Sequence, residues 1–192
     1  ILRRRGSSDE SPRPAPSRPA IRATSMHPDN IARPDSADPA SSVMRLDQIG
    51  FSAPAALLSR HGLELQRVAA GEPIPGSFWG DEEAGIIGST VYARDDTPVH
   101  SLLHEAGHLI VLPADRRPDV HTNATDSIEE EDATCYLQIV LADQLPGVGR
   151  DRLMADMDAW GYSFRLGSTR AWFEHDAGNA RDFLEARGLP HA

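Results

Sequence analysis

Hydrophobic residues gather into two long helical segments in the middle of the chain. The first runs from about Pro98 to Leu112, opens with a cap residue and a proline at positions 96–98, and is rich in leucine. The second runs from about Ser127 to Gln144 and is closed by a proline and a glycine. Between them lies a polar, turn-rich loop from Pro113 to Thr125. The pattern predicts two long helices joined by a loop long enough to be mobile or functional.

Shorter patterns flank these two helices. A short helix is expected at residues 52–60, a strand at 63–68, and a strand or hairpin at 84–94, where β-branched and aromatic residues are interrupted at Gly88. Two further helices are expected at 151–160 and at 169–187, the latter interrupted by a glycine. We therefore expect an α+β fold, with a small mixed or antiparallel sheet packed on the first long helix and a mostly helical C-terminal half.

The first 43 residues differ in composition from the rest of the chain. They hold seven of the 15 prolines, many serines and alanines, and no aromatic residue. Such a segment buries too little apolar surface to offset the entropy of ordering it. We expect residues 1–43 to form a disordered tail rich in proline, arginine and serine, and residues 44–192 to form one domain.

Charge and cysteine content exclude several classes of protein. The net charge is −10, and every one of the 19 basic side chains is arginine. An acidic chain is a poor ligand for the phosphate backbone of nucleic acid, and no apolar stretch approaches the roughly 20 residues that span a bilayer. A single cysteine, Cys135, excludes an internal disulfide and a thiolate cage, and it is expected to be inert core. We expect a cytoplasmic protein with neither nucleic acid nor membrane as a partner.

The candidate chemistry lies in an HExxH sequence at residues 104–108. Residues four apart share one helical face, so His104 and His108 can bind the same metal ion. Glu105 then lies beside a water on that ion, whose pKa the metal lowers, and can accept its proton. The spacing predicts a hydrolytic metal centre with Glu105 as its general base.

A zinc hydrolase usually has a third protein ligand. Glu130 is the first candidate, because it shares the apolar face of the second long helix, and a buried carboxylate needs a cation. Glu131 lies on the side of that helix that also carries Cys135 and Gln138. Glu129, Glu131 and the loop residue His121 remain alternatives to Glu130.

These motifs resemble those of the zincin metallopeptidases. The HEAGH sequence, followed by Glu130 three residues before Ala133, is similar to the gluzincin pattern and looks like the ImmA/IrrE type over about residues 84–145. The resemblance implies a small mixed sheet above the motif helix, zinc bound by His104, His108 and Glu130, and catalysis by Glu105. It also implies hydrolysis of peptide bonds, with a peptide or a protein as substrate.

Two other functions stay open. The chain is also similar to the bacterial elongation factor P hydroxylases, which would imply Fe²⁺ instead of Zn²⁺ and an oxidative reaction. A metal-binding regulatory module without catalysis is a third possibility. For a hydrolase, Tyr136, Tyr162 and His175 are equal candidates for stabilising the oxyanion of the transition state.

Overall fold

The computed structural model describes residues 42–78, 80–125 and 127–192, all within one compact unit, Ala32–Ala192. The expected tail, residues 1–43, lies outside the described residues except for its last two positions. Of these, Val43 is 3% exposed and belongs to the core. Packing has therefore begun one residue before the expected start of the domain.

The described part of the chain contains seven α-helices, the 3₁₀ turn η2 and three strands. The helices are α1 (Leu46–Ile49), α2 (Ser52–Arg60), α3 (Val99–Val111), α4 (Ile128–Ala142), α5 (Gly149–Trp160), α6 (Thr169–His175) and α7 (Gly178–Ala186); the 3₁₀ turn is η2 (Arg117–Asp119), and the strands are β1 (Glu64–Arg67), β2 (Gly85–Ile87) and β3 (Thr90–Ala93). The expected α+β class is confirmed. None of the described helices combines the length and apolar character needed to cross a bilayer.

The three strands form a small mixed sheet in the order β1-β3-β2. β2 and β3 are an antiparallel hairpin in which Ile87 pairs with Thr90, so its turn consists of only two residues. Gly88 begins that turn with a φ of 60°, a conformation that glycine adopts without steric cost, which explains the interruption seen in the sequence. β1 pairs with β3 in parallel. The sheet is therefore mixed, and it is as small as expected.

The loop between α3 and α4 pairs with the outer edge of β2. The amide of Thr122 donates to the carbonyl of Ile86 at 3.0 Å, and the amide of Gly88 donates to that of Val120 at 2.9 Å. This pairing satisfies edge groups that would otherwise be open to another strand. The loop is thus tied to the sheet.

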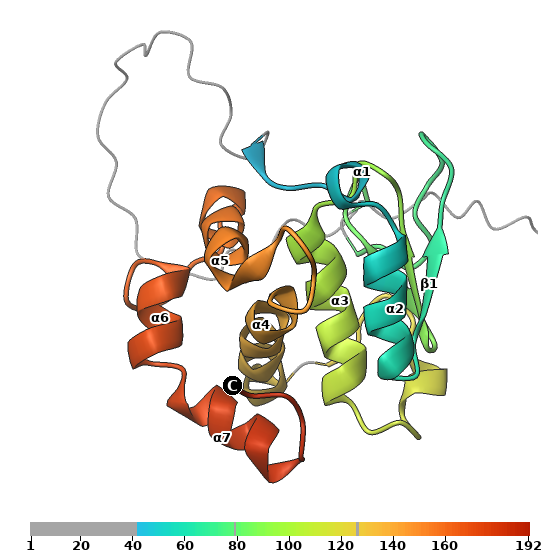
Figure 1. Cartoon of the computed structure of the whole chain (residues 1–192). Coiled ribbons are helices and arrows are strands. Elements are labelled where there is room, and N and C mark those ends of the chain that lie inside the picture. The colour runs from blue at the N-terminus through green and yellow to red at the C-terminus, as the bar shows by residue number, and fades with distance from the viewer. Residues whose placement is uncertain (1–41, 79, 126) are drawn as a thin grey trace, which may run out of the picture. The chain divides into compact units, whose positions relative to one another are not determined.

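Helices α3 and α4 pack against each other, and they lie side by side in Figure 1. On its other side α3 contacts β2 and β3, while α4 also contacts α5 and α7. Every residue of α4 from Ala133 to Ala142 is buried. The helices approach closely at Gly107, where an added Cβ would lie 3.0 Å from Cγ2 of Thr134.

The ends of the long helices agree with the sequence to within a few residues. Ser127 is the N-cap of α4, and its hydroxyl accepts a hydrogen bond from the amide of Glu130. At α3 the cap differs from the expected one, because Pro98 is itself the N-cap and no side chain caps the helix. The hydroxyl of Thr97 instead accepts from the amide of Arg94 at 3.0 Å.

Candidate metal centre

The two histidines of the HExxH sequence face each other from consecutive turns of α3. Their Nε2 atoms are 3.1 Å apart, and the ring centroids are 4.6 Å apart. Both side chains are largely buried, with exposed fractions of 16% for His104 and 12% for His108. The spacing of four residues therefore brings two imidazole nitrogens to one point, as the sequence predicted.

The carboxylate that reaches this point belongs to Glu131. Its Oε1 lies 3.4 Å from Nε2 of His104, and its Oε2 lies 3.4 Å from Nε2 of His108. A tetrahedral zinc ion with bonds of about 2.0–2.1 Å holds neighbouring ligand atoms about 3.3–3.4 Å apart. Each histidine nitrogen lies at about this distance from one oxygen of Glu131, Oε1 for His104 and Oε2 for His108, and all three groups are of types that bind divalent ions.

Glu130, the first candidate for the third ligand, lies elsewhere. Its carboxylate is 3.5 Å from Nη1 of Arg116 and accepts a hydrogen bond from the hydroxyl of Thr125. The other two alternatives also lie apart from the histidines: Glu129 is exposed, and the Nδ1 of His121 contacts the hydroxyl of Thr122 at 2.9 Å. Of the four residues considered, the structure brings only Glu131 to the histidine pair.

The burial of α4 explains this difference. Glu130 was favoured because it lies on the helical face of Leu137 and Leu141, which are indeed fully buried. From Ala133 onward, however, α4 is buried on all sides, and it contacts α3, α5 and α7, so its apolar face does not mark the side that meets α3. That side carries Glu131 and Thr134, and Thr134 is the residue next to Gly107.

Two further residues of α4 hold the imidazoles in place. Oε1 of Gln138 lies 3.1 Å from Nδ1 of His104, and the hydroxyl of Thr134 lies 3.4 Å from Nδ1 of His108. An amide oxygen can only accept, so Nδ1 of His104 carries a proton. When His104 is neutral, its lone pair is therefore on Nε2, on the side of Glu131. Such outer contacts are typical of metal-binding histidines, and no local sequence pattern predicts either of them.

Without a bound ion, the pKa values of His104, His108 and Glu131 are shifted in different directions. Burial opposes the charged form of His104, yet interactions with Tyr162, Cys135 and Glu131 raise its pKa well above the ordinary value. Burial also opposes ionisation of Glu131, but hydrogen bonding and attraction to His104 lower its pKa to about 2. For His108, burial and repulsion by His104 lower the pKa to about 3. The centre therefore pairs one positive charge with a carboxylate.

Glu105 lies on the same helix, next to the first histidine. Burial raises its pKa to about 7, although part of its accessible surface remains exposed. Attraction to His104 opposes that shift, and repulsion by Glu131 and Glu83 adds to it. A carboxyl group whose pKa lies near neutrality can both accept and release a proton under ordinary conditions.

The three oxyanion candidates separate clearly in space. The ring of Tyr162 lies edge-on to His104, with centroids 6.0 Å apart. Tyr136 instead donates its hydroxyl to the carbonyl of His191 at 3.3 Å, and the side chain of His175 is 70% exposed beside Glu174. Tyr162 is the candidate that lies at the histidine pair.

His100 lies one turn before His104 and is 1% exposed. Its ring packs against those of Trp160 and Tyr162, at centroid distances of 5.0 and 5.7 Å. Among the described residues, neither of its ring nitrogens has a hydrogen-bond partner. Burial lowers the pKa of His100 to about 3, so its imidazole is neutral near pH 7 and packs against the ring of Tyr162.

The thiol of Cys135, which the sequence predicts to be inert core, lies near Glu131 and His104. It is 6% exposed, and its Sγ is 4.0 Å from Oε1 of Glu131. One ligand atom each from His104, Glu131 and Cys135 lie within 4.8 Å of one another. Burial raises the pKa of the thiol, so in the metal-free chain it is a neutral S–H group.

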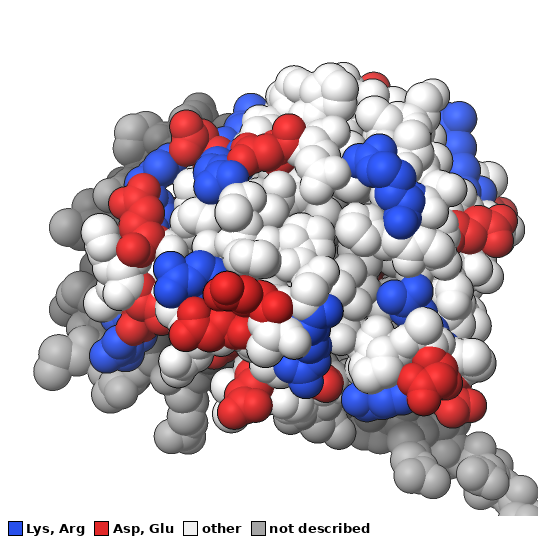
Figure 2. Space-filling view, turned by 60° about the horizontal axis from the view of Figure 1, so that its bottom comes forward, with Lys and Arg blue, Asp and Glu red and all other residues white. Residues whose placement is uncertain are grey.

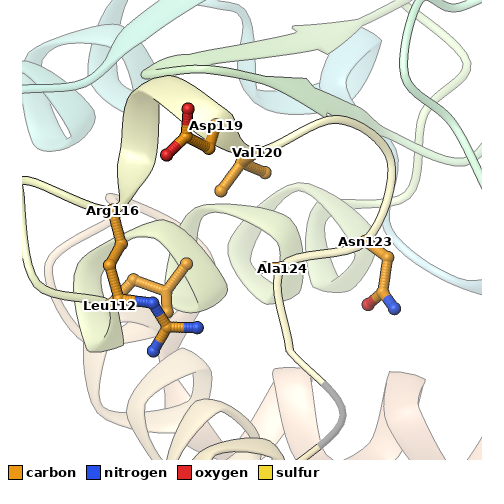
Figure 3. Close-up of a pocket in the computed structure, with 6 residues that line it drawn as sticks. All are labelled: Leu112, Arg116, Asp119, Val120, Asn123 and Ala124. Carbon is orange, nitrogen blue, oxygen red and sulfur yellow. The ribbon is translucent and has the colours of Figure 1, made fainter.

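A small pocket lies beyond the end of α3, about 150 Å³ in volume. Its lining comes from the end of α3 and from the following loop: Leu112, Arg116, Asp119, Val120, Asn123 and Ala124. Figure 3 shows this loop curving around the pocket from η2 to Ala124. Arg116 connects the pocket to Glu130, whereas the two histidines and Glu131 do not line it.

Several acidic and basic side chains on the surface form ion pairs. Ion pairs join Arg94 to Asp96 at 2.9 Å and Arg170 to Asp151 at 2.8 Å. On the face shown in Figure 2, acidic and basic side chains likewise lie next to each other. Exposed pairs of this kind contribute little to stability.

Comparison with known proteins identifies no relative. No protein-family model, no curated protein and no solved structure matches the chain.

Proposed function

We propose that the protein is a metal-dependent hydrolase that acts on peptides or proteins, with a divalent ion, Zn²⁺ in the first instance, bound by His104, His108 and Glu131. The observation that carries this proposal is the convergence of two Nε2 atoms and one carboxylate, at separations of 3.1 and 3.4 Å. Three protein ligands with one remaining position are the usual arrangement of catalytic zinc.

A zincin-like arrangement of the fold is part of the proposal. Three features support it: a small sheet that contacts α3, the HExxH sequence within α3, and a ligand-bearing helix, α4, packed on the opposite side of α3. The third ligand in this proposal is Glu131 instead of Glu130, because Glu131 contacts both histidines.

Each neighbouring side chain has a task in such a reaction. When bound, the ion supplies Lewis acidity, which polarises a substrate carbonyl and acidifies a water molecule. Glu105 accepts the proton of the attacking water and passes it to the leaving amine, a role suited to a carboxyl group of pKa about 7. Tyr162 donates a hydrogen bond to the carbonyl oxygen as it gains charge. Gln138 holds His104 so that Nε2 faces the ion.

The ligand assignment is tested by a matched pair of variants. Glu131→Gln and Glu130→Gln remove the same charge from adjacent residues of α4. We expect Glu131→Gln to weaken Zn²⁺ binding by more than about 100-fold, because loss of an outer contact alone costs about 10–100-fold. Glu130→Gln should leave the affinity nearly unchanged. Competition with a chromophoric chelator measures the Zn²⁺ affinity of both variants. A larger loss of affinity in Glu130→Gln than in Glu131→Gln would contradict the assignment.

Hydrolysis is tested with Glu105→Gln. The zinc-loaded wild-type chain should cleave members of a fluorescence-quenched peptide library, whereas Glu105→Gln should bind Zn²⁺ equally well and cleave none of them. Equal cleavage by the variant would exclude Glu105 as the general base. If the wild-type chain binds zinc tightly and cleaves no peptide, the regulatory-module alternative is favoured instead.

An iron-dependent hydroxylase is the second candidate, and the ligand set itself favours it. Two histidines and one carboxylate are also the ligands of many non-haem Fe²⁺ oxygenases. Elemental analysis of protein purified without added metal separates the two functions, together with measurement of oxygen consumption. Iron retention with oxygen uptake would replace the hydrolase proposal, while zinc retention without oxygen uptake would support it.

A further inference from the structure

The ligand-type side chains at the centre come as two matching pairs on two packed helices. His104 and His108 are four residues apart on α3, and Glu131 and Cys135 are four residues apart on α4. Because residues at this spacing share one helical face, each helix presents two donors to the other. The expected hydrolytic site uses three of these four groups and leaves the thiol without a role.

The position of the sulfur fits a role as a ligand. The distance from Sγ of Cys135 to Oε1 of Glu131 is 4.0 Å, and Oε1 is the oxygen that faces His104. A tetrahedral ion with one sulfur bond of about 2.3 Å holds sulfur and oxygen ligand atoms about 3.6 Å apart. The sulfur must therefore come about 0.4 Å closer to Oε1, and at most about 1.3 Å closer to the ligand nitrogen of His104, which lies within 4.8 Å of it. The side chain of Cys135 is also buried.

We propose that Cys135 is a fourth ligand to this ion, and that its thiolate fills the remaining position when substrate is absent. The proposal rests on the metal site of the proposed function. As the sulfur–metal bond forms, the S–H proton is released to solvent and no electron is transferred. A site closed in this way holds no activated water at rest, so substrate or water must displace the sulfur before hydrolysis begins.

Cobalt provides a direct test, because the chain has one cysteine and any thiolate signal must come from it. The metal-free full chain is titrated anaerobically with Co²⁺ alone. Charge transfer from thiolate to Co²⁺ absorbs in the near ultraviolet, whereas the visible bands of Co²⁺ report binding through any set of ligands. We expect wild-type protein to develop both signals, saturating at one equivalent.

Two variants serve as controls. Cys135→Ser and Cys135→Ala should retain the visible bands at one equivalent, through the two histidines and Glu131, and should lose the near-ultraviolet band. If wild-type protein shows the visible bands at one equivalent without the near-ultraviolet band, Cys135 is not a ligand and the inference fails while the metal site stands. If wild-type protein binds no Co²⁺, or His104→Ala binds it equally well, the proposed function and the inference fail together.

Discussion

Replacing Gly107 by alanine should disturb the candidate centre without removing any ligand. The glycine lies in α3 between the two histidines, where it faces Thr134 of α4. An added Cβ would lie 3.0 Å from Cγ2 of Thr134 and 3.4 Å from its carbonyl oxygen. Carbon atoms in contact prefer about 3.5–4.0 Å, so the methyl group overlaps a fully buried neighbour by about 0.5 Å or more.

Two opposing contributions set the effect on stability. Alanine favours the interior of a helix over glycine by about 1 kcal/mol. Overpacking a buried site costs about 1–3 kcal/mol, and here rotation of Thr134 would also break its contact with His108. We therefore expect a net loss of about 0–2 kcal/mol in the free energy of unfolding. Displacement of Thr134 should also weaken Zn²⁺ binding about tenfold, as loss of an outer contact to a histidine ligand does.

Gly178→Ala is the matched control. Gly178 is the first residue of α7, and a Cβ added there meets nothing within 4 Å. This variant should gain about 0.4–1 kcal/mol and keep its zinc affinity. Urea unfolding of the metal-free chains measures the stabilities, and chelator competition measures the affinities. If Gly107→Ala gained as much stability as Gly178→Ala and bound zinc normally, close approach of α3 and α4 would not be the reason for this glycine.

Three further predictions concern stability. Burial lowers the pKa of His100 to about 3, below the 6.5 of the unfolded chain, so only the unfolded state gains a proton at this residue as the pH falls through 6.5, and the wild-type protein loses stability. His100→Phe removes this loss, so between pH 7.5 and about pH 5 the variant should gain about 2 kcal/mol in unfolding free energy relative to wild type. Urea unfolding measures the difference, and a difference that stays constant with pH would contradict the prediction. Asp156 is 4% exposed, and it accepts hydrogen bonds from the amide of Met44 at 2.9 Å and from Nε of Arg152 at 2.7 Å. Asp156→Ala should therefore lose about 2–3 kcal/mol of unfolding free energy in the same assay. A loss below about 1 kcal/mol would refute a stabilising role for this carboxylate. Zn²⁺ at about 100 times its Kd should raise the unfolding free energy of wild-type protein by about 2.7 kcal/mol, and the same concentration should raise that of Glu131→Gln by less than about 0.4 kcal/mol; equal stabilisation of both would contradict the ligand assignment.

The sequence by itself determined the positions of the elements and the pairing of the histidines. Proline and glycine mark the ends of α3 and α4 within a few residues, because both residue types stop a helix through local backbone geometry. The turn at Gly88 follows from the same local rule. His104 and His108 meet because a spacing of four residues lies within a single helix. Each of these features depends only on residues close together in the chain.

Tertiary structure alone decided which carboxylate meets the histidines. The period of α4 placed Glu130 with Leu137 and Leu141, and that face is buried, but α3 packs against the neighbouring face with Glu131 and Thr134. Periodicity reports which positions are apolar, and it does not report which of several neighbouring helices each face contacts. The sequence did place Glu131 on the same side of α4 as Cys135 and Gln138. Only the packing of α4 on α3 brings that side to the histidines.

The same limit applies to residues that approach the centre from further along the chain. Tyr162 reaches His104 from the segment after α5, and nothing in the local sequence distinguishes it from Tyr136, which turns toward His191. Contacts between segments far apart in the chain depend on how whole helices pack. A single sequence carries no local pattern for that packing, so these residues were identified only once the helices were in place.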